Sequence, residues 1–336
     1  MLFFFNSNKM FFLFTLFFST LISISANSWL GCWIGLEINL MSFIPLISNP
    51  NNLLNSEASL KYFLTQSIAS INFLFSIILS LFLMKIFFMD KFISILINSS
   101  LLMKMGSVPF HFWFPNIMEG ISWLNCFILM TWQKITPMIL LSYYFSMKFL
   151  MFIMIFNVLI GALGGFNQTS LRKLMAFSSI NNLGWMLSAL MISENLWMIY
   201  FFLYTFLISI MCFLFYMLNI FYMNQMFNFN IKFLIKFSLM INLLSLGGLP
   251  PFLGFFPKWL IINYLILNKL YIISFFFIFM SLIMLIFYIR IIYSSFMFFS
   301  LKFKWYKIYI KNNLLIIINF FSFISLLGMI FSTFFF

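Results

Sequence analysis

Apolar stretches about as long as a bilayer is thick follow one another along almost the whole chain. A helix that crosses a membrane needs about 20 apolar residues. Of the 336 residues, 65% are hydrophobic and only 7% are charged, whereas a soluble domain carries roughly a quarter charged residues. We therefore predict an all-α, polytopic membrane protein.

About eleven spans fit this length, and no linker between them is long enough to mark a second domain. We expect one transmembrane domain over residues 1–336. The spans lie near residues 3–22, 27–47, 58–82, 92–114, 121–143, 149–167, 173–192, 197–222, 233–264, 271–297 and 313–334.

The basic residues give the chain a net charge of +13 and lie mostly at span ends. If the crossings alternate, the side that holds the N-terminus collects most of them. Basic residues favour the compartment of synthesis, so we predict a cytoplasmic or matrix N-terminus and no nucleic-acid partner. The basic residues on that side are Lys9, Lys61, Arg172, Lys173, Lys232, Lys236, Lys302, Lys304, Lys307 and Lys311, against Lys85, Lys91, Lys148 and Lys269 on the other.

The pattern Gly-x-x-Pro-Phe-x-x-x-Phe-Pro occurs twice, from Gly106 to Pro115 and from Gly248 to Pro257. Glycine and proline interrupt helices. At membrane depth an interrupted helix is tolerated only where it is buried in protein or lines a wet cavity. We therefore predict two broken helices, near residues 104–115 and 246–258.

The breaks fall in the fourth and ninth spans, so the two copies cross the membrane in opposite directions. That is the geometry of an inverted repeat, in which transporters place their ion or substrate site. Chance recurrence in a chain with 55 phenylalanines is the alternative, but glycine (12) and proline (8) are scarce. Lys104 and Lys258 lie beside the breaks, which suggests that the transported ion is a proton.

Few charged residues lie inside spans, where a charge costs about 2.5–3.5 kcal/mol. Glu37 lies in the second span and Lys134 in the fifth, near Pro137. Glu37 can also be read as a structural partner for a lysine, and Lys134 as a side chain that reaches the interface. Lys104 and Lys258 can also be read as interfacial Lys–Trp anchors.

His111 lies inside the first break, where it could relay a proton or hold structure through hydrogen bonds. It is the only histidine, which excludes a metal site with several histidines in this chain. Cys32, Cys126 and Cys212 are far apart, so no iron–sulfur cluster or zinc is supported. Glu119 and Glu194 fall in expected loops.

Seven stretches resemble the family of subunit 2 of mitochondrial NADH:ubiquinone oxidoreductase, respiratory complex I. The resemblance covers residues from about 27 to 300. The chain is rich in residues with A+T-rich codons, which suggests an organellar gene, and its composition is similar to that of arthropod members of this family. The stretches are Ser28–Pro45 with Gly-Leu-Glu37, Glu57–Gln66, Pro109–Trp113, Trp132-Gln-Lys134, Asn167–Lys173, Ser178–Trp185 and Leu246–Trp259 with Phe-Pro-Lys258-Trp.

The resemblance implies an antiporter-like subunit of the membrane arm, which translocates protons across the mitochondrial inner membrane. The family's channel residues fall on Glu37, Lys104, Lys134 and Lys258. FMN, iron–sulfur clusters and ubiquinone are expected in other subunits, and no cofactor or metal in this chain. The expected partners are neighbouring antiporter-like subunits, small membrane-arm subunits and lipids.

Two alternatives remain open on the sequence. The chain could be a stand-alone cation/proton antiporter of the related type, or a subunit that only braces the membrane arm.

Overall fold

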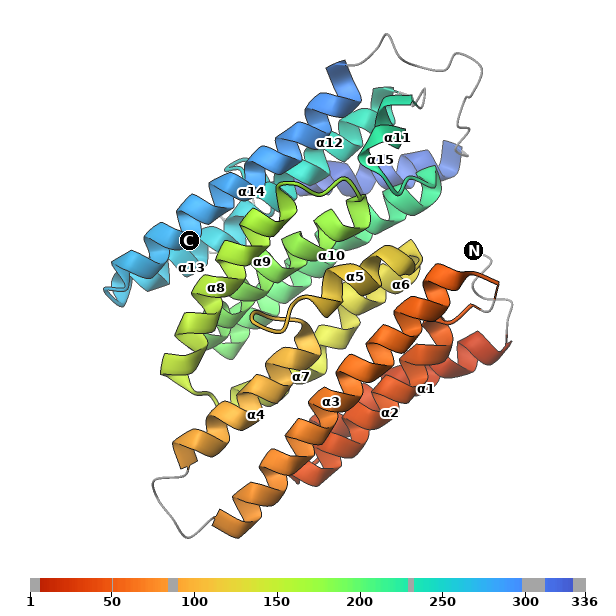
Figure 1. Cartoon of the computed structure of the whole chain (residues 1–336). Helices are drawn as coiled ribbons and strands as arrows, with labels where there is room; N and C mark the ends of the chain where they lie inside the picture. The colour runs from red at the N-terminus through yellow and green to blue at the C-terminus, as the bar shows by residue number, and fades with distance from the viewer. Residues whose placement is uncertain (1–6, 50, 84–89, 229–232, 298–311, 329–336) are drawn as a thin grey trace. The chain divides into compact units, whose positions relative to one another are not determined.

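The computed structural model describes residues 7–49, 51–83, 90–228, 233–297 and 312–328, and these are mainly helical (Figure 1). Within these ranges β-pairing is limited to one isolated antiparallel bridge between Ser170 and Tyr222. The prediction of an all-α fold is therefore confirmed. The outer ends of the first and last expected spans and several basic residues of the charge pattern lie outside the described residues, namely Lys85, Lys232, Lys302, Lys304, Lys307 and Lys311.

The chain divides into two compact units, Met1–Ile153 and Met154–Phe336. In the first unit α3 packs against α2, α4 and α5, and α7 packs against α1 and α4. The helices of this unit are α1 Ser7–Ser25, α2 Trp29–Ile47, α3 Leu53–Leu83, α4 Asp90–Met105, α5 Trp113–Gly120, α6 Trp123–Met130 and α7 Trp132–Tyr143, and α8 Met147–Gly165 runs across the boundary.

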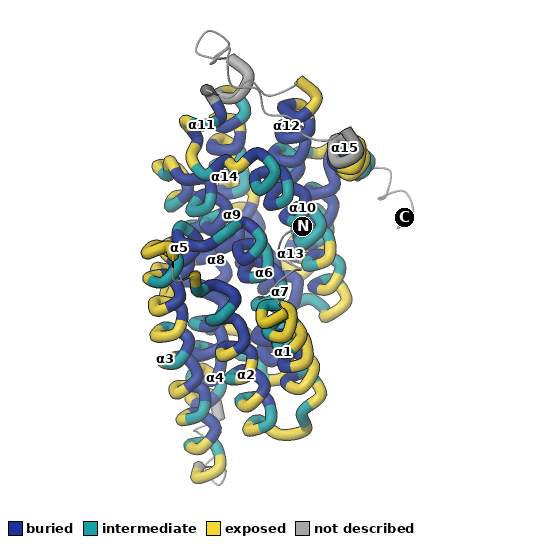
Figure 2. Tube along the Cα trace, turned by 90° about the vertical axis from the view of Figure 1, so that its right-hand side faces the viewer, coloured by how far each residue is buried: buried dark blue, intermediate teal, exposed yellow. Residues whose placement is uncertain are grey.

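In the second unit α9 is the most buried helix, and Figure 2 shows most of it in dark blue. α10 and α13 pack against α9, and α12 packs against α10, α14 and α15. The helices are α9 Leu171–Ile192, α10 Glu194–Leu218, α11 Met223–Asn228, α12 Phe233–Gly247, α13 Phe255–Leu267, α14 Tyr271–Met297 and α15 Asn312–Leu326.

Eight helical segments among the described residues are long and apolar enough to cross a membrane, with α6 and α7 counted together. Adding α4, the α12–α13 pair and α15 as one crossing each gives eleven, in agreement with the expected number. The bounds differ mainly at polar ends. α3 begins at Leu53 rather than near residue 58, because Glu57 and Lys61 form an i,i+4 ion pair of 2.5 Å that supports the extra helical turn.

Two local expectations were wrong. Glu119 lies in α5 and Glu194 begins α10, where Ser193 caps the helix by accepting a hydrogen bond of 3.3 Å from the Leu196 amide. The fifth span is interrupted at Thr131, between α6 and α7, and Pro137 lies inside α7. The Phe127 carbonyl accepts from both the amide and the hydroxyl of Thr131, at 3.1 and 2.7 Å, so Thr131 caps the end of α6.

The two broken helices are where the repeated pattern predicts them. α4 ends at Met105 and α5 begins at Trp113, while α12 ends at Gly247 and α13 begins at Phe255. The residue after each first half-helix is a glycine with positive φ, 71° at Gly106 and 83° at Gly248. Glycine reaches this left-handed conformation without the steric cost that other residues bear, so each break begins at a glycine.

The glycines that end α12 provide a matched test of this explanation. Gly248→Ala should destabilise the folded chain by about 1–2 kcal/mol, the cost of a left-handed residue with a Cβ, and the added Cβ would lie 3.0 Å from Cδ of Lys258. Gly247→Ala is the control, since its Cβ would meet its nearest neighbour, Cγ of Leu285, at an ordinary 3.4 Å. The measurement is the thermal unfolding of the assembled protein, and equal losses in the two variants would contradict the explanation.

Candidate functional site

Among the residues that the structure describes, four lysine side chains are buried, and buried charge is otherwise almost absent. Their exposed fractions are 1% for Lys134, 2% for Lys236, 7% for Lys258 and 8% for Lys104. An ammonium group held away from water is costly unless it has polar partners. The three lysines predicted from the sequence therefore lie inside their units and do not project from outer surfaces.

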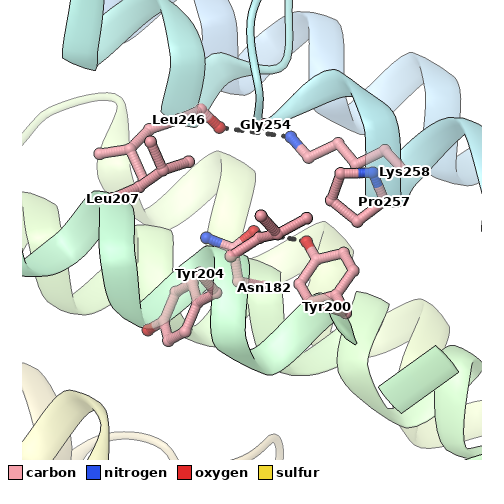
Figure 3. Close-up of a pocket in the computed structure, with 9 residues that line it drawn as sticks. Asn182, Tyr200, Tyr204, Leu207, Leu246, Gly254, Pro257 and Lys258 are labelled. Carbon is pink, nitrogen blue, oxygen red and sulfur yellow. Dashed lines mark hydrogen bonds between the residues drawn. The ribbon is translucent and has the colours of Figure 1, made fainter. Parts of the chain in front are cut away.

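Lys258 completes the hydrogen bonding of the helix end that the second break creates. The last four carbonyls of a helix have no partner within the helix. In α12 the Leu244 and Ser245 carbonyls accept from the Gly248 amide at 3.1 and 3.0 Å. Lys258 Nζ donates to the remaining two, Leu246 at 3.3 Å and Gly247 at 3.1 Å. The predicted lysine and the predicted break are therefore one structural feature (Figure 3).

The end of α4 is satisfied in a similar way, by side chains of the first unit. The Leu102 carbonyl accepts from both the amide and the hydroxyl of Ser107, at 3.1 and 3.0 Å. The Met103 carbonyl accepts from Trp113 Nε1 at 3.2 Å, and that of Lys104 accepts from Gln66 Nε2 at 3.1 Å. Lys104 itself belongs to the half-helix α4, and other side chains cap the end of that helix.

A small polar cavity of about 10 Å³ adjoins Lys104. Its polar lining comes from four helices: Asn39 of α2, Tyr62 and Gln66 of α3, Lys104 of α4, and Gln133 and Thr136 of α7. Gln133 Nε2 donates 2.8 Å to Asn39 Oδ1, which fixes the amides that face the cavity. Sequence reasoning did not single out these neutral side chains.

Glu37 is half-buried on α2 and interacts electrostatically with Lys104. The structure gives no ion pair closer than 4.0 Å between the two, whereas Lys61 and Glu57 form one near the surface. Glu37 therefore interacts with Lys104 without a direct ion pair, and its role as a channel residue stays a prediction.

Lys134 lies on α7 against the aromatic residue that closes the first repeated pattern. Its Nζ is 5.3 Å from the ring centroid of Phe114 in α5, a distance typical of a cation–π contact. Phe114 also packs on Gly106, where an added Cβ would lie 2.9 Å from the Cβ of Phe114. The break thus positions the ring that faces the buried lysine.

Lys258 faces a second small cavity, of about 20 Å³, whose lining is mainly apolar but includes several polar side chains (Figure 3). Asn182 of α9, Tyr200 and Tyr204 of α10, and residues of α12, the turn and α13 line it. The Tyr200 hydroxyl donates 2.9 Å to Asn182 Oδ1, and the indole ring of Trp185 lies 5.7 Å from Lys258 Nζ. Neither Asn182 nor Tyr200 carries a sequence signal as strong as a charge in an apolar span.

His111 lies in the turn between α4 and α5 and is 6% exposed. Its Nδ1 is 3.3 Å from the Pro109 carbonyl, and its ring lies 4.1 Å from that of Phe112. It does not line the cavity beside Lys104, so both its relay and its structural reading stay predictions.

Lys236 was assigned to the charge pattern at span ends, but its side chain is buried on α12. Its position, three residues after the start of an apolar span, is typical of an interfacial charge, and only the packing of the structure reveals the burial.

In the described part of the chain, no group of three or more His, Cys, Asp and Glu side chains could hold a metal ion.

The two small cavities beside Lys104 and Lys258 each have about the volume of one water molecule. Their linings contain hydroxyl and amide groups, which can accept a hydrogen bond from a charged amine or donate one to a neutral amine.

Comparison with known proteins identifies the fold and the family of the chain. The family model described as "NADH:quinone oxidoreductase/Mrp antiporter, TM" matches residues 26–284. Among solved structures, a chain of respiratory complex I from Thermus thermophilus has a similar fold, with a TM-score of 0.84 and 19% identity over 97% of this chain and 79% of that one. A chain of the Mrp complex from Dietzia matches with a TM-score of 0.75 and 14% identity. The match covers 84% of this chain and 59% of that one.

Relatives named "NADH-ubiquinone oxidoreductase chain 2" match most of the chain. The protein from Anopheles gambiae is 54% identical over 90% of this chain and 89% of its own length. That from Locusta migratoria is 45% identical over 89% of each chain, and that from Equus asinus 38% identical over 87% and 88%. The chain therefore belongs to the NADH-ubiquinone oxidoreductase chain 2 family, within the antiporter-like membrane proteins.

Proposed function

We propose that this chain is a core membrane-arm subunit of respiratory complex I and translocates protons across the mitochondrial inner membrane. Its family membership supports this assignment. As such a subunit it takes part in the NADH:ubiquinone reductase reaction without a redox centre of its own. It spans the membrane several times, with its N-terminus on the matrix side, where the basic residues gather. The two compact units act as the halves of one antiporter-like domain, and the two broken helices belong to inverted repeats.

The proton relay consists of Glu37, Lys104, Lys134 and Lys258. Glu37 biases the proton of Lys104, Lys134 is the central relay, and Lys258 exchanges protons with one side of the membrane. The observation that carries this proposal is the burial of three predicted lysines. Lys258 donates to carbonyls at the second break, Lys134 lies against Phe114 of the first break, and Lys104 lines a polar cavity next to the first break. His111 is a further candidate relay group.

Electron transfer and proton movement must be coupled at a distance. NADH, FMN, iron–sulfur clusters and ubiquinone belong to other subunits, so the coupling passes through conformation or charge at subunit contacts. Moving one charge against 100 mV costs about 2.3 kcal/mol, so the relay must be gated. The partners are neighbouring antiporter-like subunits, small membrane-arm subunits and lipids.

A stand-alone cation/proton antiporter is the second candidate, favoured by the fold shared with a chain of the Mrp complex. The mass of the gently solubilised particle separates the two. We expect a particle many times the 40.0 kDa of the chain, and a particle near the size of one chain would favour the antiporter.

Lys134→Met should lower the number of protons pumped per NADH in the assembled, reconstituted complex, because methionine fills the space but carries no proton. Lys148→Met is the matched control, since Lys148 is exposed at the start of α8. If Lys134→Met pumps normally in a fully assembled complex, the subunit does not use this lysine and the bracing role gains support.

Glu37→Gln should slow pumping several-fold and spare assembly, because the amide keeps the shape of the side chain but no longer biases the charge of Lys104. The measurement is the pumping rate at matched NADH oxidation. Glu194→Gln, a change at an exposed carboxylate at the start of α10, should leave that rate unchanged. Equal rates in all three proteins would remove Glu37 from the relay.

A further inference from the structure

The cavity beside Lys258 has the size of a single water site. Its volume is about 20 Å³, and a cavity needs about 10–15 Å³ and two to four polar partners to hold one water. Figure 3 shows Lys258 on one side of it and the Tyr200–Asn182 pair on the other. Tyr204, Gly254 and leucine and proline side chains complete the lining. The Tyr204 side chain is hydrogen-bonded to Ser179, so the polar partners considered for a ligand are Lys258, Tyr200, Asn182 and the helix end.

Lys258 has one more N–H bond than the helix end uses. A charged lysine has three N–H donors, and two of them go to the carbonyls of Leu246 and Gly247. In the neutral amine two N–H bonds remain, and the nitrogen gains a lone pair. The two carbonyls can therefore stay satisfied in both charge states, and only the third position changes from donor to acceptor.

The Tyr200–Asn182 pair offers both kinds of partner to a water. The Tyr200 hydroxyl commits its hydrogen to Asn182 Oδ1 at 2.9 Å, so the lone pairs of its oxygen can accept from a water. The same amide carries an N–H₂ group that can donate. This side of the cavity can therefore accept a hydrogen bond from a water through the Tyr200 oxygen, or donate one to it through the Asn182 amide.

The first unit builds a comparable cavity from the corresponding spans. The second, third and fourth spans supply Asn39, Tyr62 and Lys104 to a cavity of about 10 Å³. The seventh, eighth and ninth supply Asn182, Tyr200 and Lys258 to the other. An amide, a tyrosine and a lysine recur in the same order of spans, so the arrangement is a feature of both repeats.

We propose that Tyr200 and Asn182 are positioning residues that hold one water against Lys258 in both of its charge states. The charged lysine donates its third N–H to the water, which then donates to the Tyr200 oxygen. Beside the neutral lysine the water turns and donates to Nζ. This inference rests on the proposed relay and assigns to it a water site and two side chains.

Tyr200→Phe in the assembled, reconstituted complex tests the positioning role, because the ring stays and only the hydroxyl is lost. Losing one hydrogen-bond partner of the water should slow coupled pumping roughly two- to tenfold, and the solvent deuterium isotope effect on pumping should rise. Tyr216→Phe is the control on the same helix, since Tyr216 does not line the cavity, and it should change neither quantity.

A double-mutant cycle with Lys258→Met separates this inference from the proposed function. If both groups act through one water, Tyr200→Phe should cause no further loss in a Lys258→Met background. If Lys258→Met impairs pumping but Tyr200→Phe leaves the rate and isotope effect unchanged, the water site is refuted and the relay stands. If Lys258→Met has no effect, the proposed function fails as well.

A density map of the unaltered complex gives a second test that does not depend on how the variants assemble. It should show one ordered water within hydrogen-bond distance of both Lys258 Nζ and Tyr200 Oη. A dry cavity at a resolution that shows waters elsewhere in the protein would overturn the inference.

Discussion

Backbone carbonyls at the end of an interrupted helix cannot be left without partners in a bilayer, and this constraint organises both units. A helix broken at membrane depth exposes carbonyls that lipid cannot satisfy. At the end of α12 the remaining carbonyls are those of Leu246 and Gly247, and Lys258 satisfies both. The break is thus stabilised by a buried amine, and a buried amine is also the kind of group that a proton pathway needs.

The first unit meets the same constraint with neutral groups. Ser107, Trp113 and Gln66 satisfy the carbonyls at the end of α4, which leaves the side chain of Lys104 to face its polar cavity. The two breaks therefore share a sequence pattern and a backbone geometry, but they place their lysines differently. This difference gives a physical reason for assigning the two lysines different roles in the proposed relay.

The sequence was informative where a residue type is rare in its surroundings. Glycine and proline within an apolar span and lysine far from a span end predicted both breaks and three buried amines. Asn39, Gln66, Asn182 and Tyr200 could not be selected in this way, because neutral polar residues are common in the spans and only packing decides which of them face a cavity. The burial of Lys236 was not expected, because a lysine near a span end is normally an interfacial charge. The residue at which a given helix begins or ends depends on local hydrogen bonds, such as those of Thr131 and Ser193.

The central claim is that buried amines beside the helix breaks belong to hydrated polar sites. The most direct measurement is a density map of the assembled complex in lipid that resolves ordered water in both units. The account predicts water within hydrogen-bond distance of Nζ in Lys104, Lys134 and Lys258. Lysines that contact only acyl chains or dry protein, in a map that shows water elsewhere at the same depth, would contradict it.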